Sequence, residues 1–295
     1  MTDSPDTPVL AIDGGGTRCR IAFVRGHDRH IIETGSANVS TDFDSAVRHL
    51  LDGIQTLAQR SGTDAETLHA LPAFVGLAGV TGQALVDRLS AALPLQNARY
   101  GDDRLAALRG ALGRGDGLVA HCGTGSFFAA QIAGTHRLAG GWGSVLGDEA
   151  SAQWVGRTAL SHLLHQVDGF LPMSPMIADF RTRFSTAAEI VEFARDADPA
   201  AFGALAPQVT EHAAGGDPVA LKIMQAATDH IAANLKQMGW RSGMPICLTG
   251  GIGPHYAAYF PDAIAPDLAE PKGEPLEGAI ALAQERDKEI AHGYC

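Results

Sequence analysis

The stretch Leu10-Ala11-Ile12-Asp13-Gly14-Gly15-Gly16-Thr17 decides how the chain is interpreted, because an apolar run there ends at an acid and three glycines. Residues 9–12 are typical of a short buried strand. Three consecutive glycines place no Cβ in the turn, so backbone N–H groups can approach an anion closely. Thr17 adds a hydroxyl donor, and the Asp13 carboxylate suits a hydrated Mg²⁺ beside phosphates. Taken alone, the stretch is also compatible with a plain glycine-rich hairpin.

Two later segments repeat the pattern of a strand followed by a glycine turn. Residues 118–122 precede Gly123-Thr124-Gly125-Ser126, and an apolar run over 127–132 completes a hairpin. Near the C-terminus, residues 246–249 precede Gly250-Gly251-Ile252-Gly253. One such turn is weak evidence, but three in one chain favour nucleotide binding and phosphoryl transfer. The lysine-bearing turn of P-loop proteins is absent from the sequence.

The composition is that of an ordinary globular protein with an acid excess. The 295 residues are 45% hydrophobic and 19% charged, and this length favours two domains. A net charge of −11 disfavours nucleic acid and anionic membranes as partners. The four cysteines, at 19, 122, 247 and 295, lack metal or disulfide spacing, and those at 122 and 247 are expected to be buried thiols. Without a signal-peptide core or a membrane-spanning run, we expect a cytoplasmic protein.

Hydrophobic periodicity predicts two α/β halves that begin alike. The first half has strands at 9–13, 19–25 and 30–34, a helix at 42–60, and then strand 73–77, helix 81–93, strand 98–100 and helix 104–112. The second half has strands at 118–122, 127–132 and 136–138, helices within 148–238, and a strand at 246–249. Thr186 with Glu189, and Asp217 before Pro218, mark helix starts.

This order predicts an α/β protein with a cleft between duplicated domains. We expect an N-terminal domain over 1–113 and a C-terminal domain with a helical insertion over 114–274. A final helix over about 275–292 is expected to pack back on the first domain.

Phosphoryl transfer to a hydroxyl also needs a base, and the candidate lies in Gly101-Asp102-Asp103-Arg104. Asp103 follows a strand and precedes a helix, so as the N-cap it would be held by helix N–H groups and point into the cleft. An aspartate at such a position is more often only a cap, and Asp102 is a competing candidate.

The candidate pocket for the acceptor is the segment from Gly140 to Ala152. Its glycines permit close approach of the backbone, and Trp142 offers an apolar plate. Asp148 and Glu149 can accept hydrogen bonds from sugar hydroxyls or carry water to Mg²⁺. Ser36-Ala37-Asn38 lies between a strand and a helix and could reach the same cleft, although by itself it suggests only a turn.

Together these segments resemble the N-acetylglucosamine kinase/glucosamine kinase group of the BadF/BadG/BcrA/BcrD-type ATPase family, within the superfamily of sugar kinases, actin and heat-shock chaperones. The resemblance spans nearly the whole chain and rests on DGGGTRCR (13–20), SAN (36–38), GLAG (76–79), DDRLAALRGA (102–111), GTGS (123–126), GGWGSVLGDEASA (140–152), GDP (216–218), GGIG (250–253) and EGAIALA (277–283). It implies a two-domain ribonuclease-H-like (actin/sugar-kinase) fold, the use of ATP and Mg²⁺, phosphorylation of a sugar 6-hydroxyl, and a homodimer.

The resemblance also implies roles for single residues. It makes Asp103 the catalytic base rather than a cap, and it leaves Asp13 to hold Mg²⁺ through water. The implied ATP- and phosphate-binding residues are Gly15, Gly16, Thr17, Thr124, Gly125, Ser126, Gly250 and Gly251. The implied sugar-binding residues are Asn38, Gly79, Asp103, Gly141, Trp142, Gly143 and Asp148.

The chain departs from the family pattern at Asp102, Arg104 and Ala150. Asp102 and Arg104 stand where the family often has a neutral polar residue and a small one, and Ala150 replaces a frequent glycine. A second acid beside Asp103 is expected to raise the pKa of Asp103 by repulsion between like charges.

Four functions are compatible with the sequence. Glucosamine is favoured as the acceptor for two reasons. The sequences of several segments resemble those of bacterial glucosamine kinases, and Asp148 and Glu149 could bind an ammonium group. A kinase of N-acetylglucosamine is the first alternative. An ATP-driven activator of a reductase or dehydratase would need cysteines that bridge an iron–sulfur cluster, and none is placed for that. A sugar sensor without enzymatic activity would not need Asp103.

Overall fold

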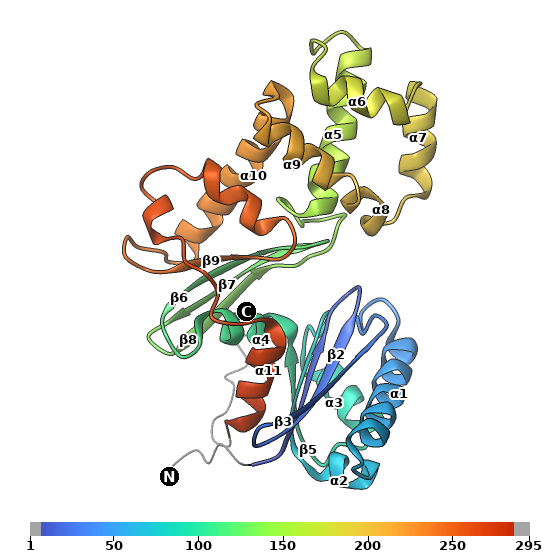
Figure 1. The fold of residues 1–295 in the computed structure, drawn as a ribbon, viewed down its shortest axis with the longest axis vertical. Helices are drawn as coiled ribbons and strands as arrows, with labels where there is room; N and C mark the ends of the chain where they lie inside the picture. The colour runs from blue at the N-terminus through green and yellow to red at the C-terminus, as the bar shows by residue number, and fades with distance from the viewer. Residues whose placement is uncertain (1–6, 286–295) are drawn as a thin grey trace. The chain divides into compact units, whose positions relative to one another are not determined.

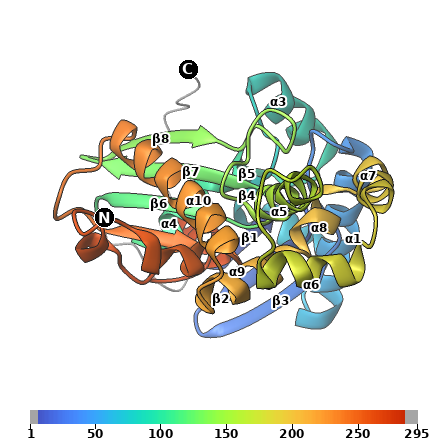
Figure 2. The same ribbon diagram turned by 90° about the horizontal axis from the view of Figure 1, so that it is seen from above.

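The computed structural model describes residues 7–285, and the chain divides into two compact units. One unit comprises Met1–Gly115 with Pro271–Cys295, and the other comprises Asp116–Glu270. Figures 1 and 2 show each unit as a sheet with attached helices. In residues 7–285 no helix combines the length and the apolar character that crossing a bilayer requires.

The first unit is built on a five-stranded sheet in the order β3-β2-β1-β4-β5. Its strands are β1 (Val9–Gly14), β2 (Cys19–Arg25), β3 (Asp28–Thr34), β4 (Pro72–Leu77) and β5 (Asn97–Asp102). Its helices are α1 (Phe43–Ser61), α2 (Ala65–Ala70), α3 (Gln83–Ala92), α4 (Asp103–Leu112) and α11 (Pro275–Gln284). Because β1, β4 and β5 run parallel, their carboxyl ends meet at one edge of the sheet.

Helices cover both faces of this sheet, as Figure 1 shows for α1 on one side and α11 on the other. Alternate residues of β1 serve the two faces: Leu10 and Ile12 belong to the cluster that contains α1, while Val9 and Ala11 belong to the cluster with α4 and α11. All four are fully buried. Each large side chain buried in this way stabilises the unit by about 1.5–3 kcal/mol.

Helices α4 and α11 cross in unusually close contact. A Cβ at Gly278 would lie 1.9 Å from the Ala106 carbonyl oxygen, and a Cβ at Gly110 would lie 2.2 Å from the Glu274 carbonyl oxygen. The C-terminal helix therefore packs against the first unit through paired glycines. This helix ends at Gln284, so the prediction that it continues through residue 285 is wrong. The remainder of the predicted helix, residues 286–292, lies outside the described residues.

The second unit has a four-stranded sheet in the order β8-β7-β6-β9. Its strands are β6 (Gly117–Cys122), β7 (Ser126–Ile132), β8 (Thr135–Gly140) and β9 (Ile246–Thr249). Its helices are α5 (Ala152–Val167), α6 (Pro175–Arg183), α7 (Ala187–Asp196), α8 (Pro199–Gly203), α9 (Ala206–Ala214) and α10 (Pro218–Gln237), with 3₁₀ turns η1 (Gly253–Tyr259) and η2 (Ala265–Asp267). The strand β6 pairs antiparallel with β7 and parallel with β9, as β1 pairs with β2 and β4 in the first unit.

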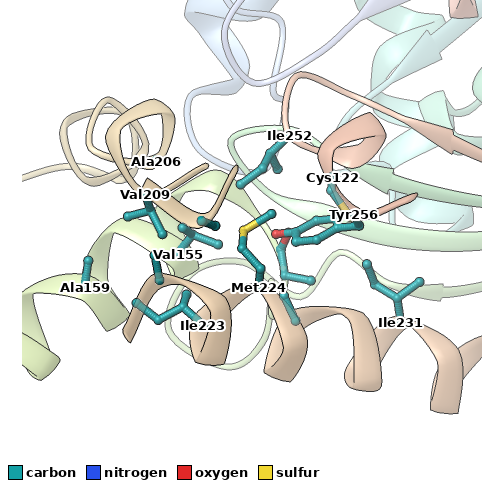
Figure 3. Packing of buried hydrophobic residues seen from close by; sticks show 14 of the residues in the cluster. Cys122, Val155, Ala159, Ala206, Val209, Ile223, Met224, Ile231, Ile252 and Tyr256 are labelled. Carbon is teal, nitrogen blue, oxygen red and sulfur yellow. The ribbon is translucent and has the colours of Figure 1, made fainter. Parts of the chain in front are cut away.

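One face of this second sheet packs on the helices of the unit. Figure 3 shows Met224 and Ile231 of α10 beside Tyr256, with Cys122 of β6 directed toward the same cluster. Cys19, Cys122 and Cys247 are buried free thiols, which confirms the expectation for the cysteines at 122 and 247. Burial raises the pKa of the Cys122 thiol to about 12, so this thiol is inert at neutral pH.

Candidate functional site

The first glycine turn lies where β1 ends in the first unit. A Cβ at Gly14 would lie 2.5 Å from Leu77 Cδ2 and 2.9 Å from Ala37 Cβ, which cannot rotate away, so the packing at this position favours glycine. The Gly15 N–H donates to the Arg18 carbonyl at 2.9 Å and closes the turn. Gly16 and Thr17 are exposed at its tip. The structure thus presents backbone N–H groups and one hydroxyl to solvent, as an anion-binding turn requires.

Asp13 forms an ion pair with Arg20 that no sequence motif predicts. It lies directly opposite Arg20 in the β1–β2 register, and its Oδ2 accepts from Arg20 at 2.8 and 3.3 Å. Arg20 also binds Glu274, next to α11. Burial raises the pKa of Asp13 despite the lowering effect of Arg20. The only sequence signal for this pair is the glycine turn, which places residues 13 and 20 at matching positions of a hairpin.

The donor set at Asp13 fits a water-mediated Mg²⁺ contact. Both hydrogen bonds from Arg20 reach Oδ2, so Oδ1 accepts none from the described residues. Within residues 7–285 no group of three or more His, Cys, Asp or Glu side chains is arranged to hold a metal directly. A single carboxylate oxygen beside a phosphate turn is the pattern by which Mg²⁺ is held mainly by water and phosphate.

The N-cap of α4 is Asp102, which corrects the expectation that Asp103 is the cap. Asp102 Oδ1 accepts from the Arg104 N–H at 2.9 Å and from Arg104 Nε at 2.7 Å, and Oδ2 accepts from Nη2 at 2.5 Å. Both carboxylate oxygens of Asp102 are therefore engaged by one arginine. The departures at 102 and 104 form a matched pair, and they leave Asp103 free of the capping role.

Asp103 is the first residue of α4 and packs over β4, since a Cβ at Gly76 would lie 3.4 Å from its Cα. Its pKa is raised well above the ordinary value, first by burial and then by the negative charges of Asp102 and Asp13. The expected repulsion from Asp102 has the right direction, but burial is the larger cause. A raised pKa makes this carboxylate a better proton acceptor than an exposed aspartate.

Asn38 and Gly79 lie together beside the first glycine turn. Gly79 has φ +83°, and a Cβ there would lie 2.7 Å from Asn38 Oδ1. Asn38 Oδ1 accepts from the N–H and the hydroxyl of Ser40 at 3.0 and 2.8 Å. The Asn38 amide nitrogen lies 3.9 Å from the Cβ position of Gly16. The first unit thus gathers Asp13, the first turn, Asn38, Gly79 and Asp103 at one edge of its sheet.

The second glycine turn follows β6 in the second unit and is closed by the Gly123 N–H, which donates to the Gly125 carbonyl at 2.9 Å. A Cβ at Gly125 would lie 2.8 Å from Asp148 Oδ2. The Ser126 hydroxyl donates to the Glu149 carbonyl at 2.6 Å, whereas Thr124 is exposed. Thr124 therefore supplies the available hydroxyl of this turn. Ser126 holds the turn against residues 141–151, the loop between β8 and α5 that carries Asp148 and Glu149 and is called the acidic loop below.

The acidic loop has two residues in the left-handed region. Asp148 has φ 61° and Ala150 has φ 65°, which costs about 1–2 kcal/mol for each residue relative to glycine. The buried Tyr256 hydroxyl, visible in Figure 3, donates to the Ala150 carbonyl at 2.7 Å. The Ser126 N–H donates to Asp148 Oδ1 at 3.3 Å, while burial raises the pKa of Asp148. The loop is thus held in shape from both sides.

Trp142 is presented on a loop made of glycines with positive φ. Gly141 and Gly143 have φ values of 73° and 84°, and the Trp142 side chain is 67% exposed. Val145 and Leu146 on the same loop are 90% and 83% exposed. The same loop therefore carries an exposed indole and the carboxylate of Asp148, and an apolar plate with a hydrogen-bond acceptor is a suitable combination for a sugar ring.

The third glycine turn sits against the second. Gly250 has φ +80°, and a Cβ there would lie 2.3 Å from the Cys122 carbonyl oxygen, so only glycine fits. The Ile252 N–H donates to the same carbonyl at 3.1 Å. Gly251 is exposed and has no heavy atom within 4 Å of its Cβ position. The second unit therefore brings together both of its glycine turns, Trp142 and Asp148.

A family model described as the BadF/BadG/BcrA/BcrD ATPase family matches residues 10–279 of the chain. A glucosamine kinase of Vibrio cholerae is 26% identical over 279 residues, which are 93% of this chain and 95% of that protein.

Two solved structures extend the comparison. A proposed N-acetylglucosamine kinase from Chromobacterium violaceum is 27% identical, with a TM-score of 0.83 over 95% of this chain and all of the other. A proposed N-acetylglucosamine kinase from Porphyromonas gingivalis is 22% identical, with a TM-score of 0.72 over 94% of this chain and 99% of the other. These likenesses, with the two sheets of matching strand order, confirm the two-domain ribonuclease-H-like α/β fold.

Proposed function

Because this chain belongs to the BadF/BadG/BcrA/BcrD ATPase family, we propose that it is an ATP-dependent amino-sugar kinase that phosphorylates the 6-hydroxyl of glucosamine. The observation that carries the proposal is Asp103, a carboxylate with a raised pKa at the edge of the sheet that bears the first glycine turn. Its neighbour Asp102 is tied to Arg104, so one of the two acids is available as the base.

In the proposed reaction Asp103 accepts the proton of the sugar hydroxyl as the oxygen attacks the γ-phosphorus. The new bond joins the sugar oxygen to phosphorus, and the bond from phosphorus to the oxygen that bridges to the β-phosphate breaks, which leaves ADP. The glycine turns bind the phosphates through backbone N–H groups, and the hydroxyls of Thr17 and Thr124 add donors. Asp13 would hold Mg²⁺ through water, and the bound ion would supply positive charge to the phosphates.

The choice of glucosamine rests on the acidic loop and on the curated relative. A protonated 2-amino group is attracted by carboxylates, and Asp148 and Glu149 supply two of them near Trp142. The Vibrio cholerae relative is named a glucosamine kinase. N-acetylglucosamine remains the second candidate, because the Chromobacterium violaceum structure of similar identity carries that name as a proposal.

The test is ADP release from Mg-ATP with glucosamine, N-acetylglucosamine and glucose measured in parallel. The proposal predicts release with glucosamine above the other two sugars, and ³¹P–¹H NMR of the product should show phosphate on O6. Preferential use of N-acetylglucosamine would keep the kinase and replace the sugar. ADP release at a rate that does not depend on any added sugar would overturn the kinase proposal and favour an ATPase that drives another protein.

A further inference from the structure

His121 of β6 is a chemically versatile side chain at the second glycine turn to which the sequence motifs assign no role. It is followed by Cys122, whose side chain points into the core shown in Figure 3. Since successive side chains of a strand point to opposite faces, His121 points to the other face of the sheet. This face of the sheet is opposite to the face that packs on the helices of the second unit.

The ring of His121 is fixed by its neighbours on both adjacent strands. The register pairs His121 with Phe127 of β7 and with Thr249 of β9. Its ring stacks on Phe127 with centroids 4.7 Å apart and an interplanar angle of 13°. Nδ1 lies 3.1 Å from Thr249 Oγ1, within hydrogen-bond distance. An imidazole held in this way has little freedom to turn, so the direction of Nε2 is set by the sheet.

The second ring nitrogen is directed at the glycine turn. His121 Nε2 lies 3.0 Å from the position that a Cβ on Gly123 would take, so the close approach of ring and turn depends on glycine. Nε2 has no hydrogen-bond partner among the described residues and is not sealed from solvent. Burial of the ring lowers the pKa of His121 to about 4, so the imidazole is neutral at physiological pH. A neutral imidazole carries one N–H, on either nitrogen.

The corresponding position in the first unit is Asp13. In that unit the last register pair of the hairpin is Gly14 with Cys19, and the Gly15 N–H closes the turn. In the second unit the last pair is Cys122 with Ser126, and the Gly123 N–H closes the turn. Asp13 and His121 are therefore each one residue before that last pair. One sheet places an acid beside its phosphate turn, and the other places a neutral nitrogen.

We infer that His121 is a phosphate-binding residue: the Thr249 hydroxyl donates to Nδ1, and the Nε2–H donates to a phosphate oxygen of the nucleotide held by the Gly123–Ser126 turn. This inference rests on the proposed nucleotide-dependent function and extends it to a residue outside the glycine motifs. Thr249 directly precedes Gly250, so the same contact joins the second turn to the third. A neutral donor suits this place, because it adds a hydrogen bond to a phosphate without placing a buried positive charge in the apoprotein.

The experiment measures equilibrium binding of ATP and of adenosine by calorimetry, without any sugar. His121→Phe keeps a ring against Phe127 but removes the donor, and we expect about tenfold weaker ATP binding with adenosine binding unchanged. His121→Gln, which can return an N–H near the Nε2 position, should recover part of the loss. His165→Phe on the exposed side of α5 is the matched control and should change neither affinity.

Equal loss of ATP and adenosine binding in His121→Phe would show that the ring only supports the fold, and no loss of ATP binding would overturn the inference directly. The inference would also be overturned if the wild-type protein bound no ATP. If the variants are unstable, ¹⁵N NMR of the wild-type histidines decides, since protonation at Nδ1 instead of Nε2 would refute the donor role. An Nε2–H signal that shifts with ATP and not with adenosine would support it. Because these measurements need no sugar, absence of sugar turnover would refute the proposed kinase while leaving the His121 result intact.

Discussion

Replacement of Gly278 by alanine should damage both the stability and the catalytic competence of the first unit. Gly278 lies in α11 where this helix crosses α4, and the new Cβ would lie 1.9 Å from the Ala106 carbonyl oxygen and 2.4 Å from the Gly110 nitrogen. Both obstacles are backbone atoms, so no side chain can rotate away. Ordinary contact begins at 3.4 Å, and the helices must therefore separate by about 3.4 − 1.9 = 1.5 Å.

Overpacking of this kind costs about 1–3 kcal/mol, and a backbone clash places Gly278→Ala at the upper end of that range. For a unit of this size, we expect the melting temperature to fall by about 4 °C per kcal/mol, or about 12 °C in all. Helix α4, which must move apart from α11, carries Asp103 in its first turn. A shift of about 1 Å at a catalytic group can lower turnover about 100-fold, so kcat should fall further than the loss of folded protein explains.

The assay is thermal unfolding followed by circular dichroism, together with steady-state kinetics at a temperature where the variant is folded. The control is Gly115→Ala in the same unit, because the nearest atoms to a Cβ there lie at ordinary contact distances of 3.6 and 3.8 Å. If Gly278→Ala melted within 2–3 °C of the wild type, the helices would have to separate at little cost. That result would refute the argument that paired glycines set the position of α4.

Four further substitutions test the site. Asp103→Asn should lower turnover about 10²–10⁴-fold with ATP affinity nearly unchanged, and retained turnover in the variant would exclude Asp103 as the base. Because the base must be ionised, wild-type activity should decline as the pH falls through the raised pKa of Asp103, which lies above the ordinary value of 3.8. The same substitution should raise stability at neutral pH, because a carboxyl with a raised pKa destabilises the fold when ionised. In contrast, Asp102→Ala should lower stability by about 1 kcal/mol through loss of the helix cap. Trp142→Ala should raise the KM for the sugar about tenfold and leave the KM for ATP unchanged; equal effects in kinetic assays would rule out its role as a plate for the sugar ring. Arg20→Gln leaves Asp13 without its ion pair, so stability should fall by about 1–3 kcal/mol at neutral pH and recover as acid protonates Asp13, and a loss independent of pH in urea titrations would contradict this.

Features with a local physical cause could be predicted from the sequence. The three glycine turns follow their strands as expected, because glycine and a preceding apolar run act within a few residues. Asp217 caps α10 by accepting from two N–H groups, and Thr186 caps α7 by accepting from the Glu189 N–H. The short helix α2 is absent from the sequence prediction, because six residues are too few to show a helical period.

Features that depend on which side chains bind each other could not be predicted in this way. Whether Asp102 or Asp103 caps α4 is decided by Arg104, which binds both oxygens of one of the two acids. The sequence shows two adjacent aspartates. It does not indicate that the Arg104 side chain turns back to bind the aspartate two residues before it. The Asp13–Arg20 pair likewise depends on the register of a hairpin, in which a slip of one residue would direct Arg20 to the opposite face.

The acidic loop shows why a departure from a family pattern can be structurally important. Ala150 stands where the family often has glycine, yet the chain keeps the left-handed conformation that glycine would allow without strain. The cost of about 1–2 kcal/mol must be offset elsewhere, and the structure offers two sources. The Ala150 side chain is fully buried, and the Tyr256 hydroxyl binds the Ala150 carbonyl. Since Tyr256 belongs to η1, which follows the third glycine turn, the shape of the acidic loop is tied to that turn within the second unit.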